Sequence, residues 1–441
     1  MAVCRNEPIF AAVMGIYRRR IADGQLKDNL EAASLVLIEG TKWCGKTTTA
    51  EQQAGSIVYM NDPEHSESYV QLAQTAPKLL LKGDTPRLID EWQDAPELWD
   101  AARFEADHRD AKTGQFIFTG STVIPAEKRE KLRHTGTGRV ARMVMRPMSL
   151  WESGESNGAL SFASLFAGET EEAYESNELG IAELAWLICR GGWPAALSMS
   201  RKGALKQSFN YIDAIAGADI SQVDGIKRDR EFALRLMKSY ARFQGAQAPI
   251  SSIYQDLKSN AESSMTEETI ASYISALKRL FVIEDSPAWN PNLRSRTAIR
   301  TSDTRYYVDP SIAAAALGIG PDDLIGDLNT MGLLFETMCV RDLRVYSEAL
   351  DGSIYHFRDK NNLECDAVMH LRNGKYGLIE VKLGGEKLIA EGAKTLSDLA
   401  RKIDTDRMKA PLFLMVLTGT GSFAYKRRDG IWVAPIGCLR P

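Results

Sequence analysis

One stretch of sequence decides the fold: Leu35-Val36-Leu37-Ile38-Glu39-Gly40-Thr41-Lys42-Trp43-Cys44-Gly45-Lys46-Thr47-Thr48. A short apolar run leads directly into a GxxxxGKT motif, and a segment typical of a helix start follows. Glycines in such a loop let backbone N–H groups converge on phosphate oxygens, and the helix N-terminus adds the positive end of its dipole. The stretch therefore predicts a phosphate-binding loop between a buried strand and a helix.

This loop supplies the residues that we expect to bind ATP and Mg²⁺. Lys46 would neutralise phosphate charge, and the Thr47 hydroxyl would ligate Mg²⁺. A chance match to the bare motif is the alternative, and the preceding apolar strand argues against it. The predicted nucleotide-binding set is Gly40, Cys44, Gly45, Lys46, Thr47 and Thr48.

Two adjacent carboxylates, Asp90 and Glu91, end the apolar stretch that begins at Arg87. Burying two carboxylates side by side is costly unless cation or water chemistry uses them. We expect Asp90 to hold Mg²⁺ and Glu91 to polarise the water that attacks the γ-phosphate. A solvated strand end is the alternative, and the phosphate-binding loop favours the catalytic interpretation.

Two further positions are candidates for catalysis. The predicted strand 115–119 brings Ser121 to its polar end, where a hydroxyl would orient the attacking water. Arg139 is a candidate arginine finger, which would act on the ATP of a neighbouring subunit and so favours a homo-oligomer. A merely solvated arginine is the alternative.

Bulk composition excludes several classes of protein. A net charge of −4 gives no global basic surface, so any nucleic-acid contact must come from local patches. No apolar run approaches the roughly 20 residues that cross a bilayer, and no secretory signal is apparent, so we expect a cytoplasmic protein without a membrane partner. The six cysteines lack metal-ligand spacing and are expected to be buried hydrophobes. The basic cluster at residues 17–20 is typical of a solvated helix face.

With 441 residues, the chain is expected to form several domains. Short apolar strands that alternate with helical stretches predict an α/β core with a parallel sheet. Later, three helical stretches precede two short predicted strands, 281–285 and 305–308, which is the order of a winged helix. The predicted division is an N-terminal helical segment (1–30), a P-loop core (31–150), a helical lid (151–225), a winged-helix-like domain (226–325) and a C-terminal α/β domain (326–441).

The C-terminal domain contains four residues with the chemistry of a magnesium-dependent nuclease. Glu336 lies on a predicted helix, Asp366 on one predicted strand, and Glu380 and Lys382 on the next. Strand alternation places Glu380 and Lys382 on one face. Carboxylates that converge on a cation, with a lysine near the nucleophilic water, would support cleavage: Glu336, Asp366 and Glu380 as metal ligands and Lys382 as catalytic residue. The alternative is a strand-edge ion pair on an inactive or scaffolding domain.

Together these motifs resemble a prokaryotic AAA+ ATPase family, related to archaeal ATPases, that carries a C-terminal domain of unknown function. The resemblance implies an ATPase core, a helical lid, a winged-helix module and a C-terminal domain similar to the PD-(D/E)XK nuclease fold. Trp193-Pro194 departs from the many AAA+ proteins that place a sensor arginine in the lid. The matching segments are the phosphate-binding loop and residues 88–93 (LIDEWQ), 118–121 (FTGS), 139, 147–150 (PMSL), 191–194 (GGWP), 305–310 (RYYVDP), 333–336 (LLFE) and 379–382 (IEVK).

Two functional hypotheses follow. In the first, ATP hydrolysis is coupled to a winged-helix and nuclease-like module that acts on double-stranded DNA, with helix 266–280 as recognition helix. The arginines at 294, 296, 300 and 305 would then contact phosphates, whereas Glu267 and Glu268 would repel them. In the second, the chain is a nucleotide-dependent regulatory or scaffolding switch whose C-terminal domain binds a protein partner without cleavage. A ring that remodels protein clients is a third alternative, but we find no convincing pore loop.

Overall fold

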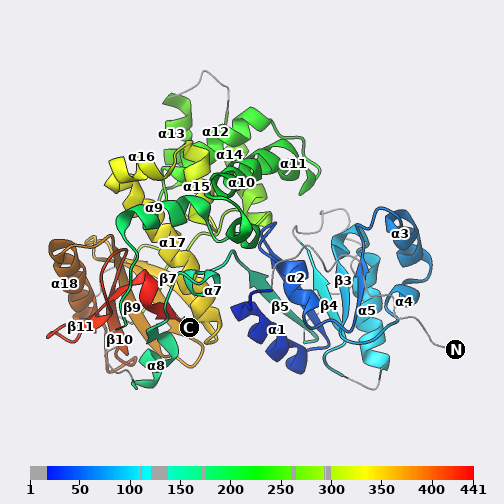
Figure 1. The fold of residues 1–441 in the computed structure, drawn as a ribbon, viewed down its shortest axis with the longest axis horizontal. Coiled ribbons are helices and arrows are strands. Elements are labelled where there is room, and N and C mark those ends of the chain that lie inside the picture. The colour runs from blue at the N-terminus through cyan, green and yellow to red at the C-terminus, as the bar shows by residue number, and fades with distance from the viewer. Residues whose placement is uncertain are drawn as a thin grey trace.

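The computed structural model describes residues 17–109, 112–120, 138–169, 175–259, 265–292, 294 and 299–441. Figure 1 shows an α/β core on one side, a C-terminal sheet on the other, and a helical region above and between them. The expected α/β P-loop core is therefore present, and a helical region and a C-terminal mixed-sheet domain follow it.

The core contains a five-stranded sheet in the order β2-β3-β4-β1-β5, with every neighbouring pair parallel. Alternate residues of β1 pack on opposite faces, Leu35 and Leu37 on one side and Val36 and Ile38 on the other. Burial on both faces explains the continuous apolar run of this strand. The core elements are α1 (Ile21–Ala32), β1 (Leu35–Gly40), α2 (Lys46–Glu51), β2 (Ser56–Tyr59), α3 (Ser66–Thr75), α4 (Pro77–Leu80), β3 (Arg87–Asp90), the 3-10 turn η2 (Trp92–Asp94), α5 (Glu97–His108), β4 (Phe116–Thr119) and β5 (Val140–Met145).

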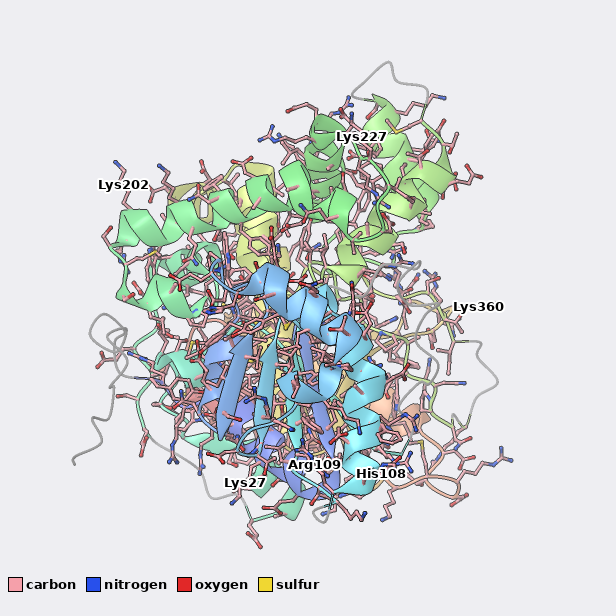
Figure 2. The ribbon with its side chains drawn as sticks, turned by 90° about the vertical axis from the view of Figure 1, so that its right-hand side faces the viewer. Lys27, His108, Arg109, Lys202, Lys227 and Lys360 are labelled. Atoms are coloured by element: carbon pink, nitrogen blue, oxygen red, sulfur yellow. The ribbon has the colours of Figure 1, made fainter. Side chains whose placement is uncertain are left out.

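Strand register brings the predicted phosphate site together. Ile38 of β1 pairs with Thr119 of β4, and Thr119 pairs in turn with Asp90 of β3. The three strands therefore end at the same edge of the sheet, where the loop after Gly40 begins. Helix α10 with Lys202 lies above this core in Figure 2, whereas Lys27, His108 and Arg109 lie at the opposite end.

Part of the segment that was predicted to form a lid contacts the C-terminal domain. Residues Leu160 and Ser161 pair with Leu439 and Arg440 of the last strand, and Phe162 packs on Phe413. Residues 160–167 therefore pack against the C-terminal domain, where β6 and β13 form a two-stranded sheet of their own. The elements are α7 (Leu150–Ser153), β6 (Leu160–Ser161), α8 (Phe162–Ala167), α9 (Ile181–Arg190), η3 (Pro194–Ser198), α10 (Arg201–Ala214), the π-helical turn η4 (Ile215–Asp219), α11 (Ile220–Gln222), α12 (Arg230–Ala241), α13 (Ile250–Ser259), α14 (Glu267–Arg279), α15 (Pro310–Leu317) and α16 (Pro321–Gly326).

Two short strands predicted after α14 are absent from the described residues as continuous strands. Two isolated antiparallel bridges stand in their place, Ile283 to Tyr307 and Ser286 to Thr304. The ion pairs of Glu284 and Asp285 with neighbouring arginines direct these side chains into the protein instead of along a regular ladder. Ala288 and Ile299 make further bridges to the first strand of the C-terminal domain and the turn after it.

The C-terminal domain is a mixed six-stranded sheet in the order β11-β12-β10-β9-β8-β7. Strands β7, β8 and β9 are antiparallel neighbours, whereas β9, β10 and β12 run parallel. Helix α17 packs beside β7 to β9, and α18 crosses between β9 and β10. The elements are α17 (Leu328–Glu348), β7 (Gly352–Arg358), β8 (Glu364–Leu371), β9 (Tyr376–Lys382), α18 (Glu386–Lys402), β10 (Phe413–Thr418), β11 (Tyr425–Lys426), β12 (Trp432–Pro435), η5 (Ile436–Cys438) and β13 (Leu439–Arg440).

Across the described ranges, no helix combines the length and apolarity that crossing a bilayer requires. All five cysteines in these ranges are buried and unpaired with one another: Cys44, Cys189, Cys339, Cys365 and Cys438.

Candidate nucleotide site and carboxylate cluster

The phosphate-binding loop leaves β1 at Gly40 and enters α2 at Lys46. Gly40 and Gly45 both have positive φ angles, and a Cβ at Gly40 would lie 2.1 Å from the Met145 carbonyl oxygen. The buried Lys46 ammonium donates to the carbonyls of Gly40 (3.0 Å) and Thr41 (2.9 Å). Cys44 is buried against Met145, whereas Thr48 is half-buried beside the loop. The predicted nucleotide-binding residues therefore form one loop, closed around the ammonium group.

Asp90 lies directly beneath this loop. Its carboxylate accepts hydrogen bonds from the Thr47 hydroxyl (2.7 Å) and from the Thr119 hydroxyl. The alternative that Asp90 is a solvated strand end is wrong, because its side chain is buried in the core. Thr47 and Asp90 are thus close enough to share one cation.

Glu91 follows Asp90 with a left-handed backbone, at a φ of 53°. This conformation is uncommon for a residue other than glycine, and strained residues of this kind are enriched at functional sites. Burial raises the pKa of the Glu91 carboxyl, and a hydrogen bond from Gln93 and the charge of Lys46 oppose this rise. The side chain lines the same cavity as Lys46 and Thr47.

A cavity of about 1200 Å³ opens beside the loop. Its walls come from the loop, from residues before α1, and from the helical region, where Pro194, Lys206 and Asn210 contribute. This volume exceeds the usual range of small-molecule sites, so the cavity has room for a nucleoside triphosphate. The site therefore lies between the core and the helical region.

The basic cluster at residues 17–20 forms part of this site, contrary to the expected solvated face. Arg20 is buried, and its guanidinium donates to the Cys44 carbonyl (2.8 Å) and pairs with Glu152 (2.9 Å). Tyr17 donates to Asp23 (2.6 Å) and, like Arg18, lines the cavity. The cluster itself was the available signal, but nothing in its composition indicated the phosphate-binding loop as partner.

The helical region also contacts the loop. The hydroxyls of Thr41 and Tyr211 are hydrogen-bonded, and Lys42 pairs with Asp219 at 2.6 Å. Trp43 packs edge-on against Tyr211, with 5.3 Å between ring centroids. Three successive loop residues are therefore tied to α10 and to the π-helical turn after it.

The two remaining catalytic candidates lie elsewhere. Ser121 falls outside the described residues. Arg139 immediately precedes β5 at the sheet edge opposite the phosphate-binding loop, and it pairs with Asp107 at 2.8 Å. It therefore cannot reach the nucleotide site of its own chain.

The C-terminal candidates come together across α17, β8 and β9. Lys382 Nζ lies 2.8 Å from a Glu380 oxygen and 3.6 Å from an Asp366 oxygen. Glu336 accepts a hydrogen bond from the Tyr306 hydroxyl. Glu336 and Asp366 both line a cavity of about 20 Å³, which is enough for one water or one ion.

The electrostatics of this cluster disfavour further negative charge. Burial and the Asp366 charge raise the pKa of Glu336 to about 8, and the same causes raise the pKa of Glu380 well above its usual range. Burial works against the charged form of Lys382, but Asp366 and Glu380 outweigh it and raise the pKa of this ammonium. Within the described ranges, no three His, Cys, Asp or Glu side chains are placed to hold a metal ion together.

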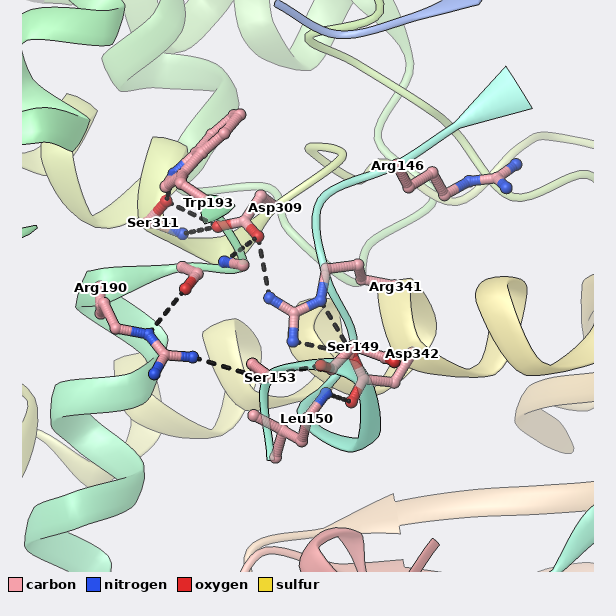
Figure 3. A network of polar contacts seen from close by, with 12 residues as sticks. Arg146, Ser149, Leu150, Ser153, Arg190, Trp193, Asp309, Ser311, Arg341 and Asp342 are labelled. Carbon is pink, nitrogen blue, oxygen red and sulfur yellow. Dashed lines mark hydrogen bonds and ion pairs between the residues drawn. The ribbon is translucent and has the colours of Figure 1, made fainter. Parts of the chain in front are cut away.

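A buried polar network joins the core to α17 (Figure 3). Arg341 pairs with Asp309 (2.8 Å) and Asp342 (2.7 Å), and all three side chains are almost fully buried. Asp309 accepts from the Gly192 N–H (2.9 Å), and Asp342 accepts from the Leu150 N–H (2.9 Å). We call Asp309, Arg341 and Asp342, with these two backbone partners, the junction.

The junction continues to the nucleotide site through aromatic side chains. Ser311 donates to Asp309 (2.6 Å) and accepts from Trp193 (2.9 Å). Trp193 packs on Tyr211, with 4.7 Å between ring centroids, and Tyr211 contacts the phosphate-binding loop. Trp193, which stands where many AAA+ proteins have a sensor arginine, is thus a buried packing residue.

The fold and the site define the class of the core. It is a P-loop ATPase domain whose nucleotide site lies at the carboxyl ends of the strands of a parallel sheet. Comparison with protein families narrows this class: residues 32–153 match the model of an AAA domain. Residues 181–323 and 331–439 match two domains of unknown function, DUF8612 and DUF4143. These matches confirm the AAA-type core and the C-terminal domain of unknown function.

Two curated relatives are uncharacterized proteins, Rv2008c of Mycobacterium tuberculosis and Mb2031c of Mycobacterium bovis. Each is 23% identical over 373 residues, which cover 83% of this chain and 74% of the relative. Among solved structures, the Walker-type ATPase PABY2304 of Pyrococcus abyssi is 13% identical and covers 67% of this chain and 94% of its own, with a TM-score of 0.38. A RuvB protein of Thermotoga maritima is 15% identical and covers 60% and 88%, with a TM-score of 0.24. Scores this low do not place the whole chain in either fold.

Proposed function

We propose that this protein hydrolyses ATP at the phosphate-binding loop and couples the nucleotide state to its C-terminal domain. The Lys46 ammonium and the loop amides bind the phosphates, and Thr47 with Asp90 would hold Mg²⁺. The ion, when bound, neutralises charge on the phosphate oxygens. Glu91 takes the proton of the attacking water. The observation that carries this proposal is the contact of Asp90 with Thr47 beneath a loop closed on Lys46.

Two substitutions separate nucleotide binding from hydrolysis. Lys46→Ala removes the phosphate-binding cation, so we expect loss of saturable binding of a fluorescent ATP analogue. Glu91→Gln keeps the loop intact, so we expect affinity close to that of the parent and kcat reduced by about 100-fold or more. Saturable binding with normal turnover in both variants would refute the proposed site.

A chain of contacts between the nucleotide site and the C-terminal carboxylate cluster supports coupling of the nucleotide state to the C-terminal domain. A change in the loop backbone displaces Tyr211, because Thr41 and Trp43 both contact it. Tyr211 packs on Trp193, and Trp193 reaches the junction through Ser311. Arg341 of the junction lies on the same helix as Glu336, so displacement of α17 also moves the carboxylate cluster.

For the C-terminal domain we propose magnesium-dependent cleavage of double-stranded DNA. Asp366 and Glu380 would hold the ion, and Lys382 would orient the nucleophilic water. Glu336, the third predicted ligand, would reach the ion only after its side chain moves, because the described positions do not bring three carboxylates onto one ion. Crowded carboxylates with raised pKa values favour cation binding, because a cation relieves their mutual repulsion. One Glu380 oxygen is buried without a hydrogen-bond partner in the described residues, as a ligand position requires.

A second candidate function is a nucleotide-dependent switch that binds a protein partner without cleavage. Lys382 is paired with both carboxylates, an arrangement that also suits a purely structural ion pair. The three described arginines of the predicted wing are engaged within the protein: Arg305 pairs with Asp285, Arg294 donates to Thr405, and Arg300 donates to Asn362. Arg296 lies outside the described residues. With Glu267 and Glu268 in the first turn of α14, these contacts weaken the case for DNA binding by the winged-helix-like segment.

Plasmid cleavage distinguishes the two functions. With Mg²⁺ and ATP, the nuclease proposal predicts nicking by the parent and little nicking by Asp366→Ala or Lys382→Ala. Arg372→Ala is a matched control, because Arg372 is an exposed residue of the same domain, just after β8. Equal nicking by all four proteins would indicate a contaminant, and absence of nicking would favour the switch.

We further propose that the chain acts as a homo-oligomer in which Arg139 reaches a neighbour's ATP. Arg139 lies at the end of the sheet opposite the nucleotide site of its own chain, as an arginine that acts on the ATP of a neighbouring subunit would. Light scattering with and without ATP tests the assembly. If the finger acts in trans, Arg139→Ala and Glu91→Gln subunits should each be nearly inactive alone and should regain part of the parent's turnover when mixed, because a Glu91→Gln subunit supplies Arg139 to its neighbour's intact site.

A further inference from the structure

Gln93 is the side chain that holds the carboxylate of Glu91. Its Nε2 donates to Glu91 Oε2 while Glu91 faces the cavity that Lys46 and Thr47 also line. The other amide atom, Oε1, is buried and has no hydrogen-bond donor among the described residues. Gln93 therefore makes one hydrogen bond to the predicted base, and its Oε1 atom remains available to accept another.

The backbone around Gln93 is anchored by aromatic packing. Its neighbour Trp92 is buried and stacks on Trp99, with 4.9 Å between ring centroids, and also packs on Phe118 of β4. The turn that carries Gln93 is thereby attached to α5 and to β4. An anchored turn holds the amide at a constant place beside Glu91.

The end of β4 is shaped to admit this amide. A Cβ at Gly120 would lie only 2.6 Å from Gln93 Oε1, so a larger residue there would displace the glutamine. Gly120 follows Thr119, whose hydroxyl donates to Asp90. The amide thus lies between the predicted base and the strand end that supports the magnesium-binding carboxylate.

We infer that Gln93 is a positioning residue for ATP hydrolysis, which orients Glu91 toward the phosphate site and keeps its carboxylate ready to accept a proton. The inference rests on the proposed ATPase activity. In the step concerned, the oxygen of water bonds to the γ-phosphorus and the bond from this phosphorus to the bridging oxygen breaks. The bonding electrons leave with ADP, and the proton of the water passes to Glu91.

The alternative role of Gln93 is a restraint that keeps Glu91 away from the phosphates. The observed contact argues against it, because Glu91 lines the phosphate cavity while Gln93 holds it. The two roles predict opposite changes: loss of a positioning residue slows hydrolysis, whereas loss of a restraint accelerates it.

Three variants of the full chain test the inference. Gln93→Met keeps the volume of the side chain and removes both hydrogen-bonding atoms. Gln93→Glu keeps the shape and places a like charge beside Glu91. Gln71→Met is the matched control, because Gln71 is an exposed glutamine of α3 that lies outside the cavity.

For Gln93→Met we expect kcat to fall about 10- to 100-fold, while KM and the dissociation constant of a fluorescent ATP analogue stay within about twofold. For Gln93→Glu we expect the acidic limb of the kcat profile to move to higher pH, because a neighbouring carboxylate disfavours ionisation of Glu91. Gln93→Met combined with Glu91→Gln should be no slower than Glu91→Gln alone. Gln71→Met should match the parent.

Unchanged or increased kcat in Gln93→Met overturns the inference. So does a joint loss of nucleotide binding and turnover, which would assign Gln93 a structural role. Failure of the proposed ATPase activity has a different signature, in which the parent does not turn over ATP faster than Lys46→Ala.

Discussion

At the scale of single residues, Gly192 is required by a close approach of two backbones. Its carbonyl accepts from the Met148 N–H (2.6 Å), and its N–H donates to Asp309 (2.9 Å). A Cβ at this position would lie 2.2 Å from the Met148 carbonyl oxygen. No side chain fits between Gly192 and Met148, so only glycine at position 192 allows these two backbone segments to pack this closely.

Gly192→Ala is therefore expected to lower the free energy of unfolding by about 2–4 kcal/mol, because backbone atoms must move to relieve the clash. Gly24→Ala is the control, since a Cβ added at Gly24, within α1, would meet no atom within 4 Å. That change should be neutral or stabilise by up to about 1 kcal/mol. Urea denaturation measures both, and a similar effect in the two variants would contradict the argument.

At the scale of elements, Arg146 at the end of the core connects β5 to the segment after α14 and to α17. Its guanidinium makes two hydrogen bonds to Glu284, at 2.7 and 2.6 Å, and pairs with Glu348 at 2.7 Å. Burial would raise the pKa of Glu284, but Arg146 and Arg344 outweigh this effect and lower it to about 2. The connection therefore depends on an ionised carboxylate.

The sign of the pH dependence follows from this lowered pKa. Stability from Glu284 is fully present above its ordinary pKa near 4.5 and is lost as pH falls toward 2. At pH 7, Glu284→Gln should be less stable than the parent by about 1–3 kcal/mol. Urea denaturation between pH 7 and pH 3 should show this difference shrinking. A difference that stays constant with pH would exclude Glu284 as its source.

The elements also show which patterns were predictable. The central strands β1, β3 and β4 of the core were predicted correctly, because burial on both faces requires continuous apolar runs. The edge strand β5 was not predicted, because its exposed Arg142 and half-buried residues interrupt the apolar pattern. The pairing of β6 with β13 was not predictable either, because each strand has only two residues, too few to show an alternating apolar pattern.

At the scale of the whole molecule, the junction connects segments that match different domain families. Leu150 of the core match, Gly192 and Asp309 of the second match, and Arg341 of the third meet within hydrogen-bond distance. Buried charges are tolerated there because each carboxylate receives an arginine and a backbone N–H. A buried charge that loses its partner is strongly destabilising, so the three parts are held in one arrangement.

Arg341→Met should reduce the free energy of unfolding by about 3–5 kcal/mol, because Asp309 and Asp342 would remain buried without their cation. Arg372→Met is the control, since its ion pair with Asp351 is exposed and should contribute at most about 0.5 kcal/mol. Hydrogen exchange of α17 tests coupling. ATP should change exchange in the parent and in Arg372→Met, but not in folded Arg341→Met.

The sequence by itself determined the phosphate-binding loop, the Asp90-Glu91 pair and the parallel core, because these depend on residues close together in the chain and on continuous apolar runs. Only the tertiary structure decided that Arg20 supports the loop, that Gly120 leaves room for the Gln93 amide, and that Arg341 joins the domains. Those contacts join segments far apart in the sequence, such as Leu150 and Asp342, which are 192 residues apart. No local pattern records such a pairing, because burial and charge neutralisation select the partner only after the chain has folded.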